Sequence, residues 1–289
     1  MSDDGESSIV VIALLGNVFS PHWARARTTD PEARSLDFSA MNVALRSPDV
    51  TRWTLTEHDR DAVKTSRERL AIGASAMAWE GEDLVVRIDE RTAPWGSVVR
   101  GTVRLTPLVV CETVVALDPK GEHTWSPRVP IARVEVTFDE PAVRFTGTGY
   151  FDLNQGECPL EETFESWSWS RVSDGERVAI AYDLALRDGP HQVRAFRGEV
   201  GHGLTAIPAN DAVALPATRF GLARTGRSAA PIEVLRTLED GPFYVRSVVA
   251  TSIDGRPAMG IHETVSLARF RAAWVRFLVQ FRIRRGPAR

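Results

Sequence analysis

The sequence predicts an all-β protein built from two antiparallel units, each a barrel or a sandwich. Strand-like segments recur about every 8–12 residues, with turn residues between them. The same pattern resumes after Trp169, so the strands fall into two groups with a boundary near residue 160. A length of 289 residues allows two domains of ordinary size. We therefore expect an N-terminal β unit over residues 1–160 and a C-terminal β unit over residues 161–289.

The first half begins with an apolar run at residues 9–15, which predicts a buried strand. A loop held by Gly16, Asn17 and Pro21 follows, and then a polar segment that we expect to be exposed. Residues 59–68 predict either a short helix or helical turn, or a solvated loop. The alternating segments that predict strands in this half are 38–45, 52–57, 77–80, 83–90, 97–105, 109–118, 131–139 and 142–152.

The second half repeats these signals up to residue 265. Turn pairs such as Asp188-Gly189, Gly241-Pro242 and Asp254-Gly255 separate its segments. The predicted strands of this half are 177–186, 193–197, 217–224, 231–239, 243–253 and 258–265.

The tail after residue 265 predicts a short C-terminal helix. Its apolar side chains follow helical spacing of three and four, at Phe270, Trp274, Phe277, Leu278 and Phe281. Arginines at 269, 271, 276, 282, 284 and 285 fill the other side. A basic amphipathic helix of this kind is typical of proteins that lie on a membrane surface. A helix that packs on a barrel with a solvated basic face explains the pattern equally well.

Composition excludes several classes of function. Lys and Arg number 35 against 38 Asp and Glu, a net charge of −3, which gives no support for a nucleic-acid partner. Two cysteines, Cys111 and Cys158, indicate a reducing compartment and buried thiols rather than a disulfide. The acidic N-terminus is a poor signal peptide, and no apolar run reaches membrane-spanning length. We expect a protein that is soluble or peripheral to a membrane.

No motif for a metal or a cofactor is present in the sequence. The six histidines show no H-x-H or H-E-x-x-H spacing, and there is no C-x-x-C pair. The G-x-S-x-G elbow, the phosphate-binding G-x-x-x-x-G-K loop and the dinucleotide-binding G-x-G-x-x-G loop are also missing. We expect a site without metal or cofactor.

The stretch from residue 121 to 171 concentrates the reactive side chains. In an extended strand Tyr150 and Asp152 share one face, as do His123 and Trp125. Trp167 and Trp169 follow at the same spacing. A carboxyl group among a phenol, an imidazole and indoles suits acid chemistry on an apolar substrate. A polar strand face turned to solvent is the alternative that periodicity alone leaves open.

Several separated motifs, in order, resemble the carotenoid 1,2-hydratases, also called hydroxyneurosporene synthases. They are G-N-V-F-S-P, L-D-F-S-A-M-N-V-A-L, R-W-T-L-T-E, G-Y-F-D-L-N-Q-G, P-L-E-E-T-F-E-S-W-S-W-S-R and T-L-E-D-G-P-F-Y-V-R-S-V-V-A-T, within residues 9–282. The resemblance implies two lipocalin-like β domains, no cofactor, and addition of water across the terminal 1,2 double bond of an acyclic carotene such as neurosporene or lycopene. It also implies a peripheral place at the cytoplasmic face of a bacterial inner or photosynthetic membrane.

The resemblance also implies roles for four residues. The family's H-x-W and Y-x-D motifs match His123 with Trp125 and Tyr150 with Asp152. Asp152 is the expected proton donor to C2, because burial raises the pKa of an aspartic acid and keeps it protonated. Trp125 is expected to stabilise the cation at C1 through its ring face.

Trp167 and Trp169 are expected to bind the substrate and to offer further ring faces. Either His123 or Tyr150 would orient the attacking water or return the proton to Asp152. If Asp152 is not the acid, Glu161, Glu162 and Asp183 are the next carboxyls to consider.

Two other functions remain open on the same scaffold. A cyclase or pericyclase would fold a polyene without needing a Y-x-D acid. A carrier of carotenoid or lipid would keep the barrel and need no acid at all. The presence of Tyr150 and Asp152 favours the hydratase.

Overall fold

The computed structural model describes residues 1–286, and it confirms the all-β prediction. The chain forms two compact units, the first from residues 1–106, 134–147 and 276–289 and the second from residues 107–133 and 148–275. The last three residues of the predicted C-terminal unit lie outside the described residues. The two units do not coincide with the predicted halves 1–160 and 161–289. The long strands β10 (His123–Glu140) and β11 (Ala142–Gly156) give residues to both.

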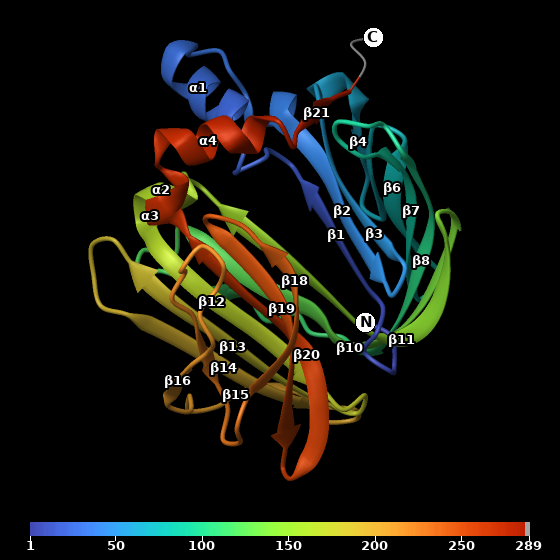
Figure 1. The fold of residues 1–289 in the computed structure, drawn as a ribbon, viewed down its shortest axis with the longest axis vertical. Helices are drawn as coiled ribbons and strands as arrows, with labels where there is room; N and C mark the ends of the chain where they lie inside the picture. Colours follow the sequence, from blue (N-terminus) through green and yellow to red (C-terminus); the bar gives the residue numbers. More distant parts are fainter. Residues whose placement is uncertain (287–289) are drawn as a thin grey trace. The chain divides into compact units, whose positions relative to one another are not determined.

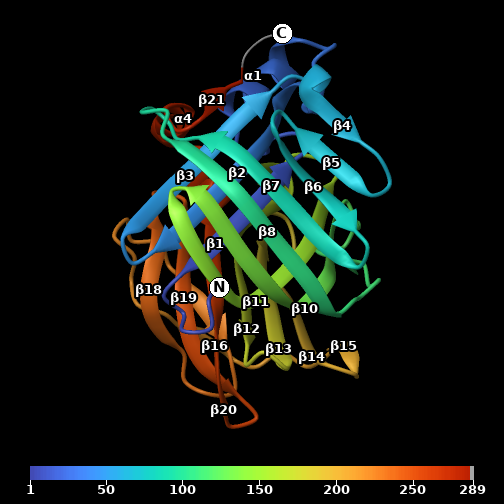
Figure 2. The same cartoon turned by 90° about the vertical axis from the view of Figure 1, so that its right-hand side faces the viewer.

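The first unit contains a four-stranded sheet and most of a larger one. The smaller sheet has the order β1-β2-β3-β21, and the larger has the order β11-β10-β8-β7-β6-β5-β4, with β9 paired to β10 (Figure 2). The strands not yet given bounds are β1 (Ser8–Leu14), β2 (Ser39–Ser47), β3 (Val50–His58), β4 (Val63–Thr65), β5 (Arg69–Ile72), β6 (Ser75–Glu80), β7 (Asp83–Arg91), β8 (Val98–Val109), β9 (Val115–Ala116) and β21 (Arg284–Arg285).

The first unit contains short helices, one of them in a segment where the sequence predicts loops. The segment expected to be a loop and an exposed stretch contains α1 (Pro21–Thr29). The Ser20 hydroxyl caps this helix by accepting from the Trp23 amide at 3.2 Å, and Pro21 occupies its first turn. Of the short helix or helical turn predicted at 59–68, a single turn forms, η2 (Arg60–Ala62), and it leads into β4. A second such turn, η1 (Ser35–Phe38), precedes β2.

The second unit is organised around a seven-stranded antiparallel sheet (Figure 1). Its order is β15-β14-β13-β12-β20-β19-β18, and a separate hairpin joins β16 to β17. Its elements are α2 (Leu160–Thr163), β12 (Phe164–Ser173), β13 (Arg177–Leu186), β14 (Gln192–Glu199), β15 (Gly203–Ala206), β16 (Ala212–Ala214), β17 (Thr225–Arg227), β18 (Glu233–Asp240), β19 (Tyr244–Ile253), β20 (Arg256–Ser266) and α3 (Leu267–Phe270). The strand predicted at 217–224 is not formed.

Two glycines explain local features of this sheet. Asp254 and Gly255 both have positive φ, 49° and 77°, as a two-residue turn between β19 and β20 requires. Gly260 lies opposite Val172 of the neighbouring strand β12, where a Cβ atom would come within 1.8 Å of the Arg171 carbonyl oxygen. β20 can therefore approach β12 this closely only with glycine at that position.

The register of the sheet aligns polar and aromatic residues in one row. Residues directly opposite each other on neighbouring strands share a face. The row runs from β18 to β14 through Glu239, Arg246, Glu263, Trp169, Tyr182 and Arg194. Trp125 of β10 packs on this face, because its ring lies 5.7 Å from that of Tyr182.

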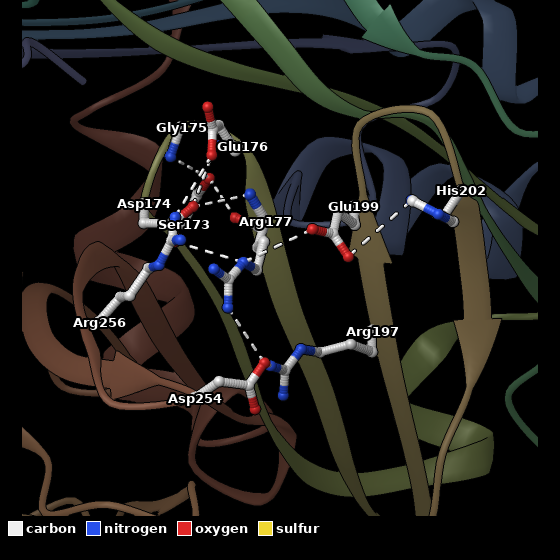
Figure 3. A network of polar contacts seen from close by, with 10 residues as sticks. All are labelled: Ser173, Asp174, Gly175, Glu176, Arg177, Arg197, Glu199, His202, Asp254 and Arg256. Atoms are coloured by element: carbon white, nitrogen blue, oxygen red, sulfur yellow. Dashed lines mark hydrogen bonds and ion pairs between the residues drawn. The ribbon is translucent and has the colours of Figure 1, made fainter.

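Ion pairs connect the hairpin turns of the second unit (Figure 3). Asp254 accepts hydrogen bonds from Arg177, at 3.2 Å, and from Arg197. Arg177 also lies 3.8 Å from Glu199. Apart from Arg177 these side chains are solvent-accessible, and exposed pairs of this kind contribute little each to stability. The network links the turns to one another. It does not include the residues of the row that runs from Glu239 to Arg194.

The C-terminal tail differs from the single amphipathic helix predicted over 269–285. It forms α3, then α4 (Ala273–Gln280), then β21, which pairs parallel to β3. Several arginines expected to face solvent bind protein groups instead. Arg282 stacks on the Trp53 ring at 3.7 Å, and Arg285 lies 3.7 Å from the fully buried carboxylate of Glu57. Among residues 1–286 no helix has the length and apolar character needed to span a membrane.

Candidate active site

Three side chains from β10 and β11 form a hydrogen-bonded cluster around one carboxyl oxygen. The indole N–H of Trp125 donates to Oδ2 of Asp152 at 2.8 Å. The Tyr150 hydroxyl donates to the same oxygen at 3.0 Å, and it accepts from the Trp125 N–H at 3.1 Å. The alternation of β11 places Tyr150 and Asp152 on one face, and β10 supplies Trp125. The carboxyl group is therefore fixed from two sides.

Aromatic rings surround this cluster. Trp125 is fully buried, and its ring lies 5.7 Å from Tyr182 of β13 and 5.4 Å from Phe196 of β14. The ring of Tyr150 lies 5.5 Å from that of Trp169 on β12. Apart from the hydrogen bonds to Asp152, these neighbours offer the carboxyl group an apolar environment.

This environment changes the acidity of both groups on β11. Burial raises the pKa of Asp152 to about 6, and the negative charge of Glu263 acts in the same direction. The hydrogen bonds from Trp125 and Tyr150 partly offset that rise, because they favour the carboxylate. Burial, together with the neighbouring Asp152, holds the pKa of Tyr150 well above its usual value. Asp152 can thus carry a proton in mildly acidic to neutral solution, while Tyr150 stays a donor.

Arg171 braces the strands that carry the cluster. Its buried guanidinium donates to the Pro130 carbonyl oxygen of β10, twice at 3.1 Å, and to the Gly149 carbonyl oxygen of β11 at 3.0 Å. It also lies 5.6 Å from the centre of the Tyr150 ring. Burial lowers the pKa of Arg171 to about 10, so the side chain remains charged at neutral pH.

Replacing Arg171 with Met is expected to lower the free energy of unfolding by about 3 kcal/mol, because two buried carbonyl oxygens lose their donor. Urea denaturation followed by tryptophan fluorescence measures this loss. Arg256→Met is the matched control, since Arg256 is exposed and pairs with the exposed Glu176. Its effect should stay within about 0.5 kcal/mol. Equal losses in the two variants would contradict the bracing role.

The structure places His123 outside this hydrogen-bonded cluster. Its side chain is buried, with Nε2 3.1 Å from the Cys158 carbonyl oxygen and the ring edge-on to Phe164 at 5.0 Å. Its Nδ1 lies 3.5 Å from Oδ2 of Asp118 without the geometry of a hydrogen bond. These contacts anchor the start of β10. The predicted role of His123 in orienting water stays a prediction.

The two other tryptophans predicted for the site sit differently. Trp169 faces Tyr150, and its indole N–H is buried and makes no hydrogen bond within the described part of the chain. Trp167 packs edge-on against Phe164 at 6.0 Å. It also lines a cavity of about 470 Å³ whose walls include Ser168, Asp183 and Thr264.

That cavity is separate from the cluster around Asp152. Ser168 is one residue from Trp169 along β12 and therefore points to the opposite face of the sheet. Asp183 is one of the carboxyls to consider if Asp152 is not the acid. On that opposite face its carboxylate accepts a hydrogen bond from Arg227 at 2.6 Å. Its position does not favour a role beside Tyr150.

Sequence reasoning missed several residues around Asp152. Their types alone gave no sign of function, because each is one member of an alternating strand. They become neighbours of the cluster only through strand pairing, and they are Arg171, Tyr182, Phe196, Arg246 and Glu263. The sequence holds two signals for them: Arg171 and Arg246 lie within motifs that carry the family resemblance, and Glu263 is the single acidic residue of the segment G-I-H-E-T-V.

Fold and site together define the class of protein. It is a lipocalin-like β protein whose central polar group is a partly buried aspartic acid held by a phenol and an indole. Within residues 1–286, His, Cys, Asp and Glu form no group of three or more arranged to hold a metal ion.

The chain belongs to the carotenoid hydratase CrtC family, whose sequence profile matches residues 11–289. An acyclic carotenoid 1,2-hydratase of Thiocapsa roseopersicina is 40% identical over 99% of this chain and 71% of its own length. One of Cereibacter sphaeroides is 33% identical over 96% of this chain and 98% of its own length. The resemblance seen in the sequence motifs is thereby confirmed.

A solved structure supports the fold. The crystal structure of kievitone hydratase from Nectria haematococca superposes with a TM-score of 0.57, covering 92% of this chain and 86% of that one. At 9% identity this likeness concerns the architecture alone.

Proposed function

We propose that this chain adds water across the terminal 1,2 double bond of an acyclic carotenoid such as neurosporene or lycopene, with Asp152 as the acid. The observation that carries the proposal is the cluster in which Trp125 and Tyr150 both donate to one oxygen of a carboxyl whose pKa is raised to about 6. Family membership and the activity named for the relatives give the substrate class.

Hydration starts with transfer of a proton from Asp152 to C2. Trp125 and Tyr150 hold the acid through hydrogen bonds to Oδ2 of Asp152. The π electrons of the double bond form the new C2–H bond, and the positive charge is left on the tertiary carbon C1. Water then attacks C1 and loses a proton, giving the 1-hydroxy carotenoid.

The aromatic rings share the remaining tasks. Because the Trp125 N–H is bonded to Asp152 and its ring packs on Tyr182 and Phe196, its main task is to position the acid. Trp169, whose ring lies next to that of Tyr150, therefore takes the role predicted for Trp125 and stabilises the cation at C1 through its ring face. Aromatic faces of this kind lower the energy of a nearby cation by about 0.5–2 kcal/mol.

The deciding experiment is incubation of the purified protein with lycopene and with neurosporene, followed by mass spectrometry. The proposal expects a product heavier by one water. An isomer of unchanged mass would favour the cyclase or pericyclase, and bound but unchanged carotenoid would favour the carrier. The cyclase and carrier need no acid group in the position of Asp152.

The substrate is a membrane lipid, so a peripheral place on a bacterial inner or photosynthetic membrane belongs to this proposal. Two features of the tail support it. The aromatic side chains on α4 and just beyond it are exposed, and Phe277 packs on Phe281 at 5.1 Å. The arginines Arg282 and Arg285 bind protein groups, so the apolar side chains are the main candidates for lipid contact.

Replacing Trp274, Phe277 and Phe281 together with Ser is expected to weaken binding to liposomes by about tenfold or more, because it removes the exposed apolar side chains. Co-sedimentation with neutral and with anionic liposomes measures the change. Trp95→Ser is the control, since Trp95 is an exposed tryptophan outside the tail. Unchanged binding of the triple variant would remove the tail from the proposal.

These substitutions are better tests than truncation of the tail. Deleting residues from 270 onward would also remove the fully buried Phe270 and the arginine that pairs with the buried Glu57. A truncated chain would therefore lose stability for reasons unrelated to lipid.

A further inference from the structure

A second carboxyl group faces the same interior as Asp152. Glu263 lies directly opposite Trp169 across the β12–β20 pair, and Trp169 in turn lies opposite Tyr182. Side chains so placed share one face, with Cβ atoms about 4.5–5.5 Å apart. Trp169 also contacts the ring of Tyr150, which donates to Asp152. Trp169 thus neighbours Glu263 and the Tyr150 ring, and the charge of Glu263 acts on Asp152.

Arg246 holds Glu263 in a way that sets it apart from Asp152. The Arg246 Nε donates to Oε1 of Glu263 at 2.7 Å, and its side chain is only 3% exposed. A second carboxylate, Glu239, accepts from the same guanidinium at 2.6 Å. Asp152 is held by indole and phenol donors, whereas Glu263 is paired with an arginine. Hydrolytic enzymes also place an acid and a base in different environments. By this comparison Asp152 corresponds to the acid and Glu263 to the base.

Glu239 lies one strand farther from Trp169, beyond Arg246, and the remaining groups on this face are unsuited to accept a proton. Burial raises the pKa of Tyr182 and of Tyr244, so both phenols stay protonated. Arg171 is cationic. The Trp169 indole N–H is buried and has no hydrogen-bond acceptor among residues 1–286, and Trp169 lies opposite Glu263 with its ring against that of Tyr150. It can bind the oxygen of a water but cannot take its proton.

We infer that Glu263, held by Arg246, is the base that removes a proton from the water as it attacks C1. This inference rests on the proposed function and adds the second half of its chemistry. Asp152 gives its proton to C2 and becomes a carboxylate. The water oxygen forms the bond to C1, its O–H electron pair stays on oxygen, and the released proton goes to Glu263. Return of that proton to Asp152 through solvent restores both carboxyl groups. The net reaction is therefore carotene plus water giving the 1-hydroxy carotenoid.

The matched variants for a test are Glu263→Gln and Glu239→Gln. Each removes one of the two carboxylates bound to Arg246, and each leaves Arg246 paired with the other. Of the two, Glu263 is the one beside Trp169. We expect Glu263→Gln to lower the hydration rate by about 10²-fold or more, as loss of a general base does. Glu239→Gln should keep a rate near that of the wild type.

Deuterium exchange separates the base from a structural residue. In D₂O the Asp152 carboxyl carries deuterium and transfers it to C2. A cation that is not captured by water can then lose the C2–H proton to the Asp152 carboxylate, which restores the double bond and leaves deuterium at C2. Glu263→Gln should therefore put deuterium into recovered lycopene while forming little alcohol. Asp152→Asn should do neither. Mass spectrometry of both carotenoid fractions gives the two rates.

Three results would overturn the inference. The first is a wild-type hydration rate in Glu263→Gln. The second is loss of both deuterium exchange and hydration in that variant. The third is a fall in hydration rate in Glu239→Gln as large as that in Glu263→Gln. Failure of the wild-type protein to hydrate any acyclic carotene is a different result. It would remove the proposed function and this inference with it.

Discussion

Asp152→Asn is expected to lower carotene hydration by about 10⁴-fold, the upper end of the effect of removing a general acid. The amide keeps the size of the side chain and can accept from Trp125 and Tyr150, but it has no acidic proton to give. Asp152→Glu should restore little, because one added methylene moves the carboxyl group away from both donors. Rates with lycopene and neurosporene measure the loss. A folded Asn variant with a tenth or more of wild-type activity would falsify the assignment, against the magnitude above.

Stability supplies the control for folding. The pKa of Asp152 is about 6 in the folded protein and 3.8 in the unfolded chain, so its contribution to stability is present below pH 3.8 and is lost as the pH rises through 6. Asn carries no such charge. At pH 8 the Asn variant should therefore be more stable than the wild type, by about 1 kcal/mol after allowance for partial exposure of the side chain. At pH 3.5 the difference should vanish.

Trp125→Leu is expected to abolish most activity, while Trp125→Phe keeps part of it. Leu loses both the N–H donor to Asp152 and the ring contacts with Tyr182 and Phe196. Phe loses only the donor, which is worth about tenfold. Circular dichroism must show that both variants are folded, because truncating a buried aromatic to Ala costs about 3–5 kcal/mol. Equal rates for Leu and Phe would mean that the ring only fills space.

The pH profile of Trp125→Phe tests the hydrogen bond itself. Activity requires protonated Asp152, so the wild-type rate should fall as the pH rises through about 6. The bond from Trp125 lowers the pKa of Asp152, and its removal raises that pKa. The fall in activity should consequently move to higher pH in the Phe variant. An unmoved profile would contradict a direct contact between the indole and the acid.

Much of the fold could be predicted from the sequence because its strands are strongly patterned. The segment 177–186 has the bounds of β13, and 243–253 differs from β19 by one residue. The failures were local. The segment 217–224 has strand-like residues but forms no strand, and α1 depends on the Ser20 cap and Pro21 more than on an apolar face. The interleaved units could not be predicted, because only pairing shows that β10 and β11 serve both.

The site was predictable along one strand and not across several. Alternation places Tyr150 beside Asp152, and the family motif singles out both. The bond from Trp125 depends on how β10 lies against β11, and Glu263 comes to lie opposite Trp169 through the register of β12 with β20. A period of two residues says which side chains share a face and says nothing about the neighbouring strand.

The pairing of β21 with β3 has a consequence for synthesis on the ribosome. The edge of the β1–β2–β3 sheet is completed by residues 284–285, and the buried carboxylate of Glu57 obtains its arginine from the same segment. The sheet is therefore incomplete when its first three strands emerge from the ribosome. The edge of β3 stays unpaired while the second unit is translated. Contacts so distant along the chain slow folding, and an open edge can pair with another chain. Nascent chains stalled before residue 280 should accordingly be the form most in need of a chaperone.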